Sequence, residues 1–166
     1  MIDAKDRSLL ELLQRDARLS TLELAEAVGL AASSVHERVK KLEREGYITG
    51  YGARVDAGRL GKTLLAFMRL SFGTTESQSL EQVKRALLAL CAEEPDVLEC
   101  HNVAGEDCYV LKLRAEGPAR LEELIARIRG CAQSSRSVTS IVLSTYKESA
   151  LVAPLAPAPA PAEGRA

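Results

Sequence analysis

The chain has 166 residues, enough for one medium domain or two small ones, and its hydrophobic content of 46% suffices for a core in either case. A formal net charge of −1 excludes the overall basic field of a nucleic-acid packaging protein, so any DNA binding must come from local charge. Charged residues at the N-terminus exclude a secretory signal, and the longest apolar run, residues 86–92, is too short to span a membrane. We therefore expect a soluble, cytoplasmic protein.

Three short helices are predicted within residues 3–45. Asp3 and Asp6 stand at the N-cap and N3 positions of the first helix, and Ser20 and Glu23 form the capping-box pair of the second. A glycine after the last apolar position of the second helix supplies a left-handed residue for a tight turn, and the apolar pattern then resumes. Two helices that meet across a turn of about three or four residues are typical of a helix-turn-helix.

The third helix turns Val35, Val39 and Leu42 inward, and its polar side is the candidate DNA-contacting surface. Its net charge of about +1 does not by itself distinguish a DNA-reading helix from a solvated helix laced with ion pairs. The spacing does, because Ala25, Gly29 and Val35 supply a small residue at the helix crossing, a turn glycine and an apolar residue that packs back. The candidate DNA-binding residues are Ser33, Ser34, His36, Glu37, Arg38, Lys40, Lys41 and Arg44.

The segment over residues 47–62 holds four glycines between short β-prone pieces. This composition predicts a small hairpin, which would be the wing of a winged helix, followed by a hinge. From Leu64 the apolar period changes to two, which predicts a half-buried strand.

The rest of the chain alternates between strand and helix. The expected elements are a helix over residues 79–92, a hairpin of strands over 97–103 and 108–114, a helix that begins at Pro118, and a strand over 138–146. The order βαββαβ predicts a ferredoxin-like fold, with two helices on one face of a four-stranded antiparallel sheet. Leu111 with Leu113, or else Val110, is expected on the uncovered face, so we expect dimerisation through the sheet.

Four cysteines show neither the paired spacing of a zinc site nor the secretory context that favours disulfides. They are Cys91, Cys100, Cys108 and Cys131. We expect reduced thiols packed in a core, with neither a bound metal nor a cofactor.

Three stretches resemble the Lrp/AsnC family of transcriptional regulators, also called feast/famine regulatory proteins. They are DARLSTLELAEAVGLAASSVHERVKKLEREGYITGYGARVD, PDVLECHNVAGEDCYVLKL and SVTSIVLST. The resemblance covers residues 2–148. It implies an N-terminal winged helix-turn-helix that binds double-stranded DNA, a C-terminal ligand-sensing domain, and homodimers that assemble into octamers or other dimer-based rings.

With this resemblance the expected organisation is an α+β chain. It has a winged helix-turn-helix domain in residues 1–50, a hinge in 51–62, a ferredoxin-like (RAM-type) effector-binding and oligomerisation domain in 63–148, and a disordered tail rich in Ala and Pro in 149–166. One departure from the family is Ala31, which stands where a capping Ser is usual. Ser33 or Ser34 is left to cap the third helix slightly later or to bind a phosphate.

The turn between the two strands of the predicted hairpin is the candidate effector site. Read locally, it is a hairpin turn in which Gly105 adopts a positive φ and two acids face water. The resemblance implies a site for a small effector, usually an amino acid, at the junction between dimers. Glu106 and Cys108 stand where the family commonly has two Asp, so Asp107 is left as a second candidate acid. The implied effector residues are Gly105, Glu106, Asp107, Cys108, Thr139 and Ser140.

The expected function is therefore sequence-specific transcriptional regulation tuned by a small effector, an amino acid, and not an enzymatic activity. The alternative is an enzyme like the siroheme decarboxylases, which resemble this family in both domains and depend on histidine and arginine side chains in a porphyrin pocket. This chain has two histidines, one of them on the third helix. A sensor that has lost DNA binding is a third possibility, against which Lys40, Lys41 and Arg44 argue.

Overall fold

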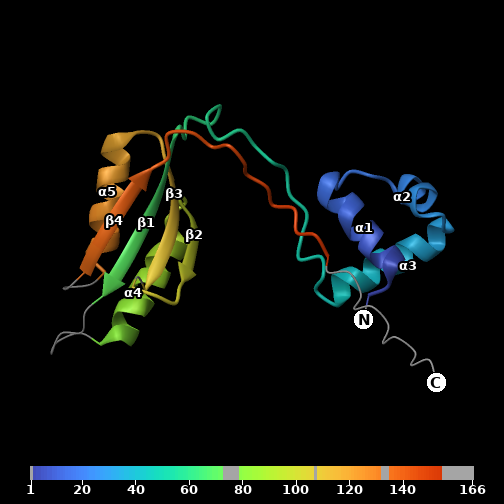
Figure 1. The fold of residues 1–166 in the computed structure, drawn as a ribbon, viewed down its shortest axis with the longest axis horizontal. Helices are drawn as coiled ribbons and strands as arrows, with labels where there is room; N and C mark the ends of the chain where they lie inside the picture. Colours follow the sequence, from blue (N-terminus) through green and yellow to red (C-terminus); the bar gives the residue numbers. More distant parts are fainter. Residues whose placement is uncertain (1, 73–78, 107, 132–134, 155–166) are drawn as a thin grey trace, which may run out of the picture. The chain divides into compact units, whose positions relative to one another are not determined.

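The computed structural model describes residues 2–72, 79–106, 108–131 and 135–154 (Figure 1). They divide into two compact units. The N-terminal unit contains the residues up to Arg54 together with those from Lys147 onward, and the sheet unit is Val55–Tyr146. Within the described ranges, every helix is too short or too polar to cross a lipid bilayer.

Three helices form the N-terminal unit: α1 (Ala4–Arg15), α2 (Thr21–Val28) and α3 (Ala32–Arg44). Both predicted capping boxes are confirmed, at Asp3 with Asp6 and at Ser20 with Glu23. One face of each helix contributes to a shared core, and each fully buried leucine stabilises it by about 1.5–3 kcal/mol. The buried apolar residues are Leu9, Leu10, Leu13, Leu24, Ala25, Val28, Val35 and Leu42.

The hairpin predicted after α3 is absent, because residues 47–62, all of which the structure describes, contain no strand. The β-prone pieces between the glycines are only two or three residues long, too short to sustain a ladder of hydrogen bonds. The segment instead contacts α3 and its core: the amides of Tyr47 and Ile48 bond to the carbonyl of Leu42, and Ile48 packs against the core. The hydroxyl of Tyr51 donates a hydrogen bond of 2.8 Å to Oε1 of Glu43.

The sheet unit has the predicted βαββαβ order. Its elements are β1 (Leu64–Phe72), α4 (Leu80–Glu93), β2 (Val97–Asn102), β3 (Tyr109–Ala115), α5 (Pro118–Arg129) and β4 (Ser135–Ile141). The strands are antiparallel in the order β2-β3-β1-β4. This is the ferredoxin-like arrangement, and it confirms the predicted fold class.

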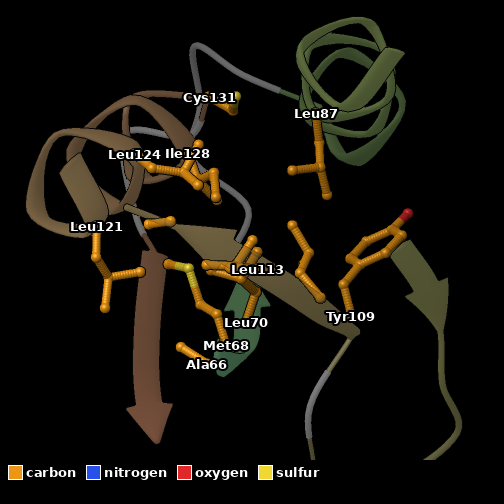
Figure 2. Packing of buried hydrophobic residues seen from close by; sticks show 12 residues of the cluster. Ala66, Met68, Leu70, Leu87, Tyr109, Leu113, Leu121, Leu124, Ile128 and Cys131 are labelled. Carbon is orange, nitrogen blue, oxygen red and sulfur yellow. The ribbon is translucent and has the colours of Figure 1, made fainter. Parts of the chain in front are cut away.

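The structure decides which of the two predicted alternatives lies on the open face of the sheet. Leu111 and Leu113 are fully buried, opposite Met68 and Ala66 of β1, and they pack under the helices rather than on the open face. Figure 2 shows Leu113 in the same core as Leu87 of α4 and Ile128 of α5. Because neighbours along a strand alternate in direction, Val110 lies on the open face. Of the alternatives considered from the sequence, Val110 is the one on the open face.

Two element boundaries also differ from prediction. The last strand begins three residues earlier than expected and ends at Ile141, because its length follows its partner β1, which it pairs from Phe72 back to Ala66.

A buried cluster of charges joins the start of the sheet to its helices. Glu94 and Asp96, between α4 and β2, are both almost fully buried, and Arg120 of α5 bonds to both carboxylates, at 2.5 Å and 2.8 Å. Arg127 also pairs with Glu94, and Lys62, just before β1, lies 2.6 Å from Asp96. Three cations thus compensate the two buried carboxylates, which would otherwise be costly to bury.

Candidate functional site

The outward side of α3 carries polar and basic groups, several of which have no ion-pair partner among the described residues. Val35 and Leu42 are fully buried, so the helix has one fixed inner stripe. Ser33, Ser34, His36, Glu37, Lys40 and Arg44 are exposed, and Lys41 is half-buried. Among the described residues, none of Lys40, Lys41 and Arg44 has an ion-pair partner. Their charges are therefore available to an anionic ligand.

Arg38 differs from the other predicted DNA-binding residues. Its Nη1 lies 2.6 Å from Oδ2 of Asp3 and 2.7 Å from Oδ1 of Asp6, and Asp6 is 1% exposed. The hydrogen bond from the Asp6 backbone, and then the bond from Arg38, hold the pKa of Asp3 below its usual range. The same carboxylates raise the pKa of Arg38 above its ordinary value. Arg38 therefore fixes α3 against the start of α1.

The turn that precedes α3 is set by Gly29 at the end of α2. Gly29 has φ 65° in the left-handed region, as the sequence predicts. The ammonium group of Lys5 bonds to the carbonyl of Val28 and so satisfies an acceptor at the negative end of α2. At Ala31, the N-cap of α3, no side chain caps the helix. The family's usual capping bond is therefore missing at this position.

The candidate effector turn lies at the β2–β3 end of the sheet. Gly105 has φ 140°, and a Cβ built on it would meet no atom within 4 Å, so the space beside it is open. The carbonyl of Cys108 accepts hydrogen bonds from the Asn102 side chain (2.9 Å) and the Val103 amide (3.0 Å). Glu106 is exposed, and its carbonyl accepts a bond of 3.0 Å from the Ser71 hydroxyl. Asp107, the alternative acid, lies outside the described residues.

Thr139 and Ser140 do not join that turn within one copy of the chain. They are on β4, opposite Met68 and Phe67, and β1 separates β4 from β3. Neighbouring strands are spaced by about 4.8 Å, so β3 and β4 are about 10 Å apart. Thr139 faces the helix-covered side and Ser140 the open side, because they are neighbours on one strand. The five predicted effector residues that the structure describes therefore form no single pocket in an isolated chain.

Several contacts at these sites involve residues that the sequence analysis did not single out. Tyr51 bonds to α3 through Glu43, and burial together with this bond raises the pKa of Tyr51 to about 12. Ser71 and Asn102 fix the effector turn. Local patterns gave no signal for these contacts, since each joins segments whose relative positions only the folded chain determines.

Two family models match the chain. The model described as "Winged helix-turn-helix DNA-binding" matches residues 2–49, and the model described as "Lrp/AsnC ligand binding domain" matches residues 65–152. The leucine-responsive regulatory protein of Escherichia coli (strain K12) is 33% identical over 152 residues, which are 89% of this chain and 88% of that protein. The proline dehydrogenase transcriptional activator of Rhizobium radiobacter is 30% identical over 151 residues, covering 90% of this chain and 94% of the relative.

Solved structures are similar over both units as well. A feast or famine regulatory protein from M. tuberculosis, complexed with L-methionine, matches with a TM-score of 0.80 and 34% identity. The match covers 93% of this chain and 100% of the other.

Proposed function

The chain belongs to the Lrp/AsnC family of transcriptional regulators, and from that membership we propose which residues contact DNA, which bind an effector and how copies assemble. Its N-terminal unit is the DNA-binding helix-turn-helix, and its sheet unit is the ligand-binding domain. In this proposal the DNA-binding domain spans residues 1–50, the hinge 51–62 and the effector-binding and oligomerisation domain 63–148. The Ala- and Pro-rich tail spans 149–166, of which 155–166 lie outside the described residues.

The outward side of α3 enters the major groove in this proposal. The observation that supports it is a set of basic side chains without ion-pair partners among the described residues: Lys40 and Arg44, which are exposed, and Lys41, which is half-buried. Ser33, Ser34, His36 and Glu37 are the remaining candidates for contacts to bases and phosphates. Arg38 acts indirectly by holding the helix in place against Asp3 and Asp6.

The effector is an amino acid bound at the turn that contains Gly105. The M. tuberculosis neighbour in complex with L-methionine supports this ligand class. The open space beside Gly105 admits a ligand close to the backbone, and the carboxylate of Glu106 is exposed to receive an ammonium group. Cys108 borders the same turn, and Asp107 remains the second candidate acid. Thr139 and Ser140 contribute from another copy of the chain, since β1 separates them from the turn within one copy.

The chain forms dimers through the open face of its sheet, and the dimers assemble into an octamer or another ring. Phe67, Val138 and Leu98 are large apolar residues on the sheet with 40%, 38% and 51% exposure. Apolar side chains that gather on a sheet face that no helix covers are typical of a buried interface. A monomer in light scattering at micromolar concentration would contradict this assembly.

The regulator has no enzymatic activity in this proposal. A decarboxylase of the siroheme type would require histidines in a porphyrin pocket, whereas His101 pairs with Glu99 at 3.1 Å and His36 lies on α3. Absorbance titration with an iron porphyrin tests the alternative directly, because saturable binding in the Soret band would favour it.

Genomic footprinting of the purified full-length protein, with and without a panel of amino acids, tests the proposed function. We expect protected sites with dyad symmetry, spaced by about one helical turn of DNA or a multiple, and a change in occupancy with one or a few amino acids. Protection that no amino acid changes would contradict the proposed effector class. Absence of any protected site would contradict the proposed DNA-binding role of α3.

A further inference from the structure

Two thiols meet between α4 and β2, on the helix-covered side of the sheet. Cys91 follows the fully buried Leu87 by one helical turn, so it is on the same inward side of α4. Cys100 is opposite Leu111 of β3, so its side chain also faces the helices. Figure 2 shows Leu87 pointing from α4 into the core that these residues border. Cys91 and Cys100 therefore face each other from α4 and β2, and both pack against the same buried core.

The two sulfurs are chemically unequal. The hydrogen bond from Cys91, together with the positive charge that His101 can carry, lowers the pKa of Cys100 to about 7 against the opposing effect of burial. The same hydrogen bond and burial raise the pKa of Cys91. Cys100 therefore loses its proton more readily than Cys91. A thiolate beside a second, protonated thiol is the arrangement found at redox-sensing cysteine pairs.

Solvent exposure distinguishes Cys91 and Cys100 from the third nearby thiol, Cys131. Cys91 and Cys100 are half-buried, so a small oxidant can reach them. Cys131 is buried, its thiol lies 3.7 Å from the carbonyl of Arg127, and burial raises its pKa. Cys108 is at the far end of the hairpin, beside the effector turn. Among the described residues no cluster of ligands is suited to a metal ion, so the pair is not part of such a site.

We propose that Cys91 and Cys100 are a modification site at which hydrogen peroxide forms a reversible intramolecular disulfide between α4 and β2. The Cys100 thiolate attacks one peroxide oxygen, the O–O bond breaks, and the products are a Cys100 sulfenic acid and, after protonation, water. The Cys91 sulfur then attacks the sulfenic sulfur, forming the S–S bond and releasing a second water. The two thiols lose two electrons, peroxide gains them, and both thiol protons end in water.

The disulfide joins α4 to the hairpin that carries the effector turn. The test of this disulfide is independent of the proposed effector site, because bond formation is measured on the protein without any effector. Disulfides in reducing compartments are typically transient and serve redox sensing.

The test uses the full-length, reduced protein and hydrogen peroxide at a few equivalents. Free thiols are counted by alkylation after denaturation, and the cross-link is mapped by mass spectrometry. Trypsin leaves Cys91, Cys100 and Cys108 on one peptide, so digestion must also cleave after Glu93, Glu99 and Glu106. We expect the loss of two thiols, a linked pair of peptides that contain Cys91 and Cys100, and full reversal by dithiothreitol.

Single variants distinguish the role of Cys100, which reacts with peroxide, from that of Cys91, which reacts with the sulfenic acid. Cys91→Ser should stop at a sulfenic acid on Cys100 that dimedone traps, and Cys100→Ser should slow thiol loss at pH 7 at least about tenfold. The matched controls Cys108→Ser and Cys131→Ser should keep the disulfide. Circular dichroism checks folding, and Cys91→Ala replaces the serine variant if the hydroxyl disturbs the core. Retention of all four thiols, or a disulfide through Cys131 or Cys108, would overturn the proposal.

Discussion

Nη1 of Arg38 in α3 lies 2.7 Å from Oδ1 of Asp6 in α1, where Asp6 is 1% exposed. The pair joins the first turn of one helix to the middle of another, and the same Asp6 completes the capping box with Asp3. A residue on the predicted DNA-binding helix thus serves the packing of the helix-turn-helix.

Replacing Arg38 by alanine should reduce the free energy of unfolding of the N-terminal unit by about 1–3 kcal/mol, because a buried carboxylate loses its cation. Chemical denaturation followed by circular dichroism measures this. Arg44→Ala is the matched control, since Arg44 is exposed on the same helix and has no ion-pair partner among the described residues. It should change stability by less than about 0.5 kcal/mol. Equal stability of the two variants would contradict the packing role of Arg38.

Replacing Lys40 and Lys41 together by alanine should weaken DNA binding and flatten its salt dependence. Each lost phosphate contact reduces the slope of log K against log salt by about one unit. Fluorescence anisotropy with an operator fragment at several salt concentrations measures both quantities. Lys84→Ala, which removes an exposed lysine of α4 that pairs with Glu81, is the control and should leave the slope unchanged. A wild-type slope in the double variant would refute the proposed contacts.

Replacing Gly105 by threonine should abolish the effect of the amino acid on operator occupancy and oligomer size. A side chain at φ 140° strains the backbone, and a Thr side chain fills the open space that a ligand needs. Effector-free DNA binding should stay within about twofold of wild type, because the change is confined to the sheet unit.

Gly117→Thr is the matched control for that variant. Gly117 has an extended φ of −177° at the N-cap of α5, where threonine is acceptable. Titration of the amino acid, followed by anisotropy and light scattering, compares the two. A wild-type response in the Gly105 variant would mean that the ligand binds elsewhere.

Acid should destabilise the sheet unit through Glu94 and Asp96. Burial alone would raise the pKa of each group, but the bonds from Arg120 to both, and from Lys62 to Asp96, outweigh it and hold both pKa values below the ordinary 4.5 and 3.8. A depressed folded pKa gives stability that is fully present above the unfolded value and is lost as the pH falls through the folded one.

Acid titration followed by circular dichroism should therefore show unfolding below about pH 4.5, the range in which these groups begin to take up protons. Glu94→Gln should shallow the pH dependence while lowering stability at pH 7, because the amide removes one titrating group and its attraction for Arg120. Glu81→Gln, at an exposed position of α4, should follow the wild-type curve. An unchanged pH dependence in the Glu94 variant would contradict the role of the cluster.

The sequence predicted the elements whose signals are local. The capping pairs, the turn at Gly29 and the alternation over β1 depend on neighbouring residues, and the structure has each of them. The face of the sheet on which Leu111 lies depends on register and on helix packing, so the sequence alone left open whether Leu111 or Val110 lies on the open face. The partner of Arg38 is 32 residues away at Asp6, and no pattern within one helix predicts that contact.

The candidate effector site was also predictable only in part. The family pattern drew attention to Gly105, whose positive φ the structure confirms. Thr139 and Ser140 came from the same pattern, but β1 stands between them and the turn. A site that needs side chains from more than one copy of the chain cannot be assembled from the spacing of residues along one copy.

The side-chain amide of Gln14 in α1 bonds to both backbone groups of Val152, at 2.9 Å and 2.7 Å, across 138 residues of sequence. Ribosomes add about 5–20 residues per second, so this contact cannot form until about 7–28 s after Gln14 is made. The three N-terminal helices can pack during that interval. Closure of the N-terminal unit by its returning segment therefore waits until Val152 has been made, and a nascent chain halted before Val152 would carry a helix-turn-helix that lacks this contact.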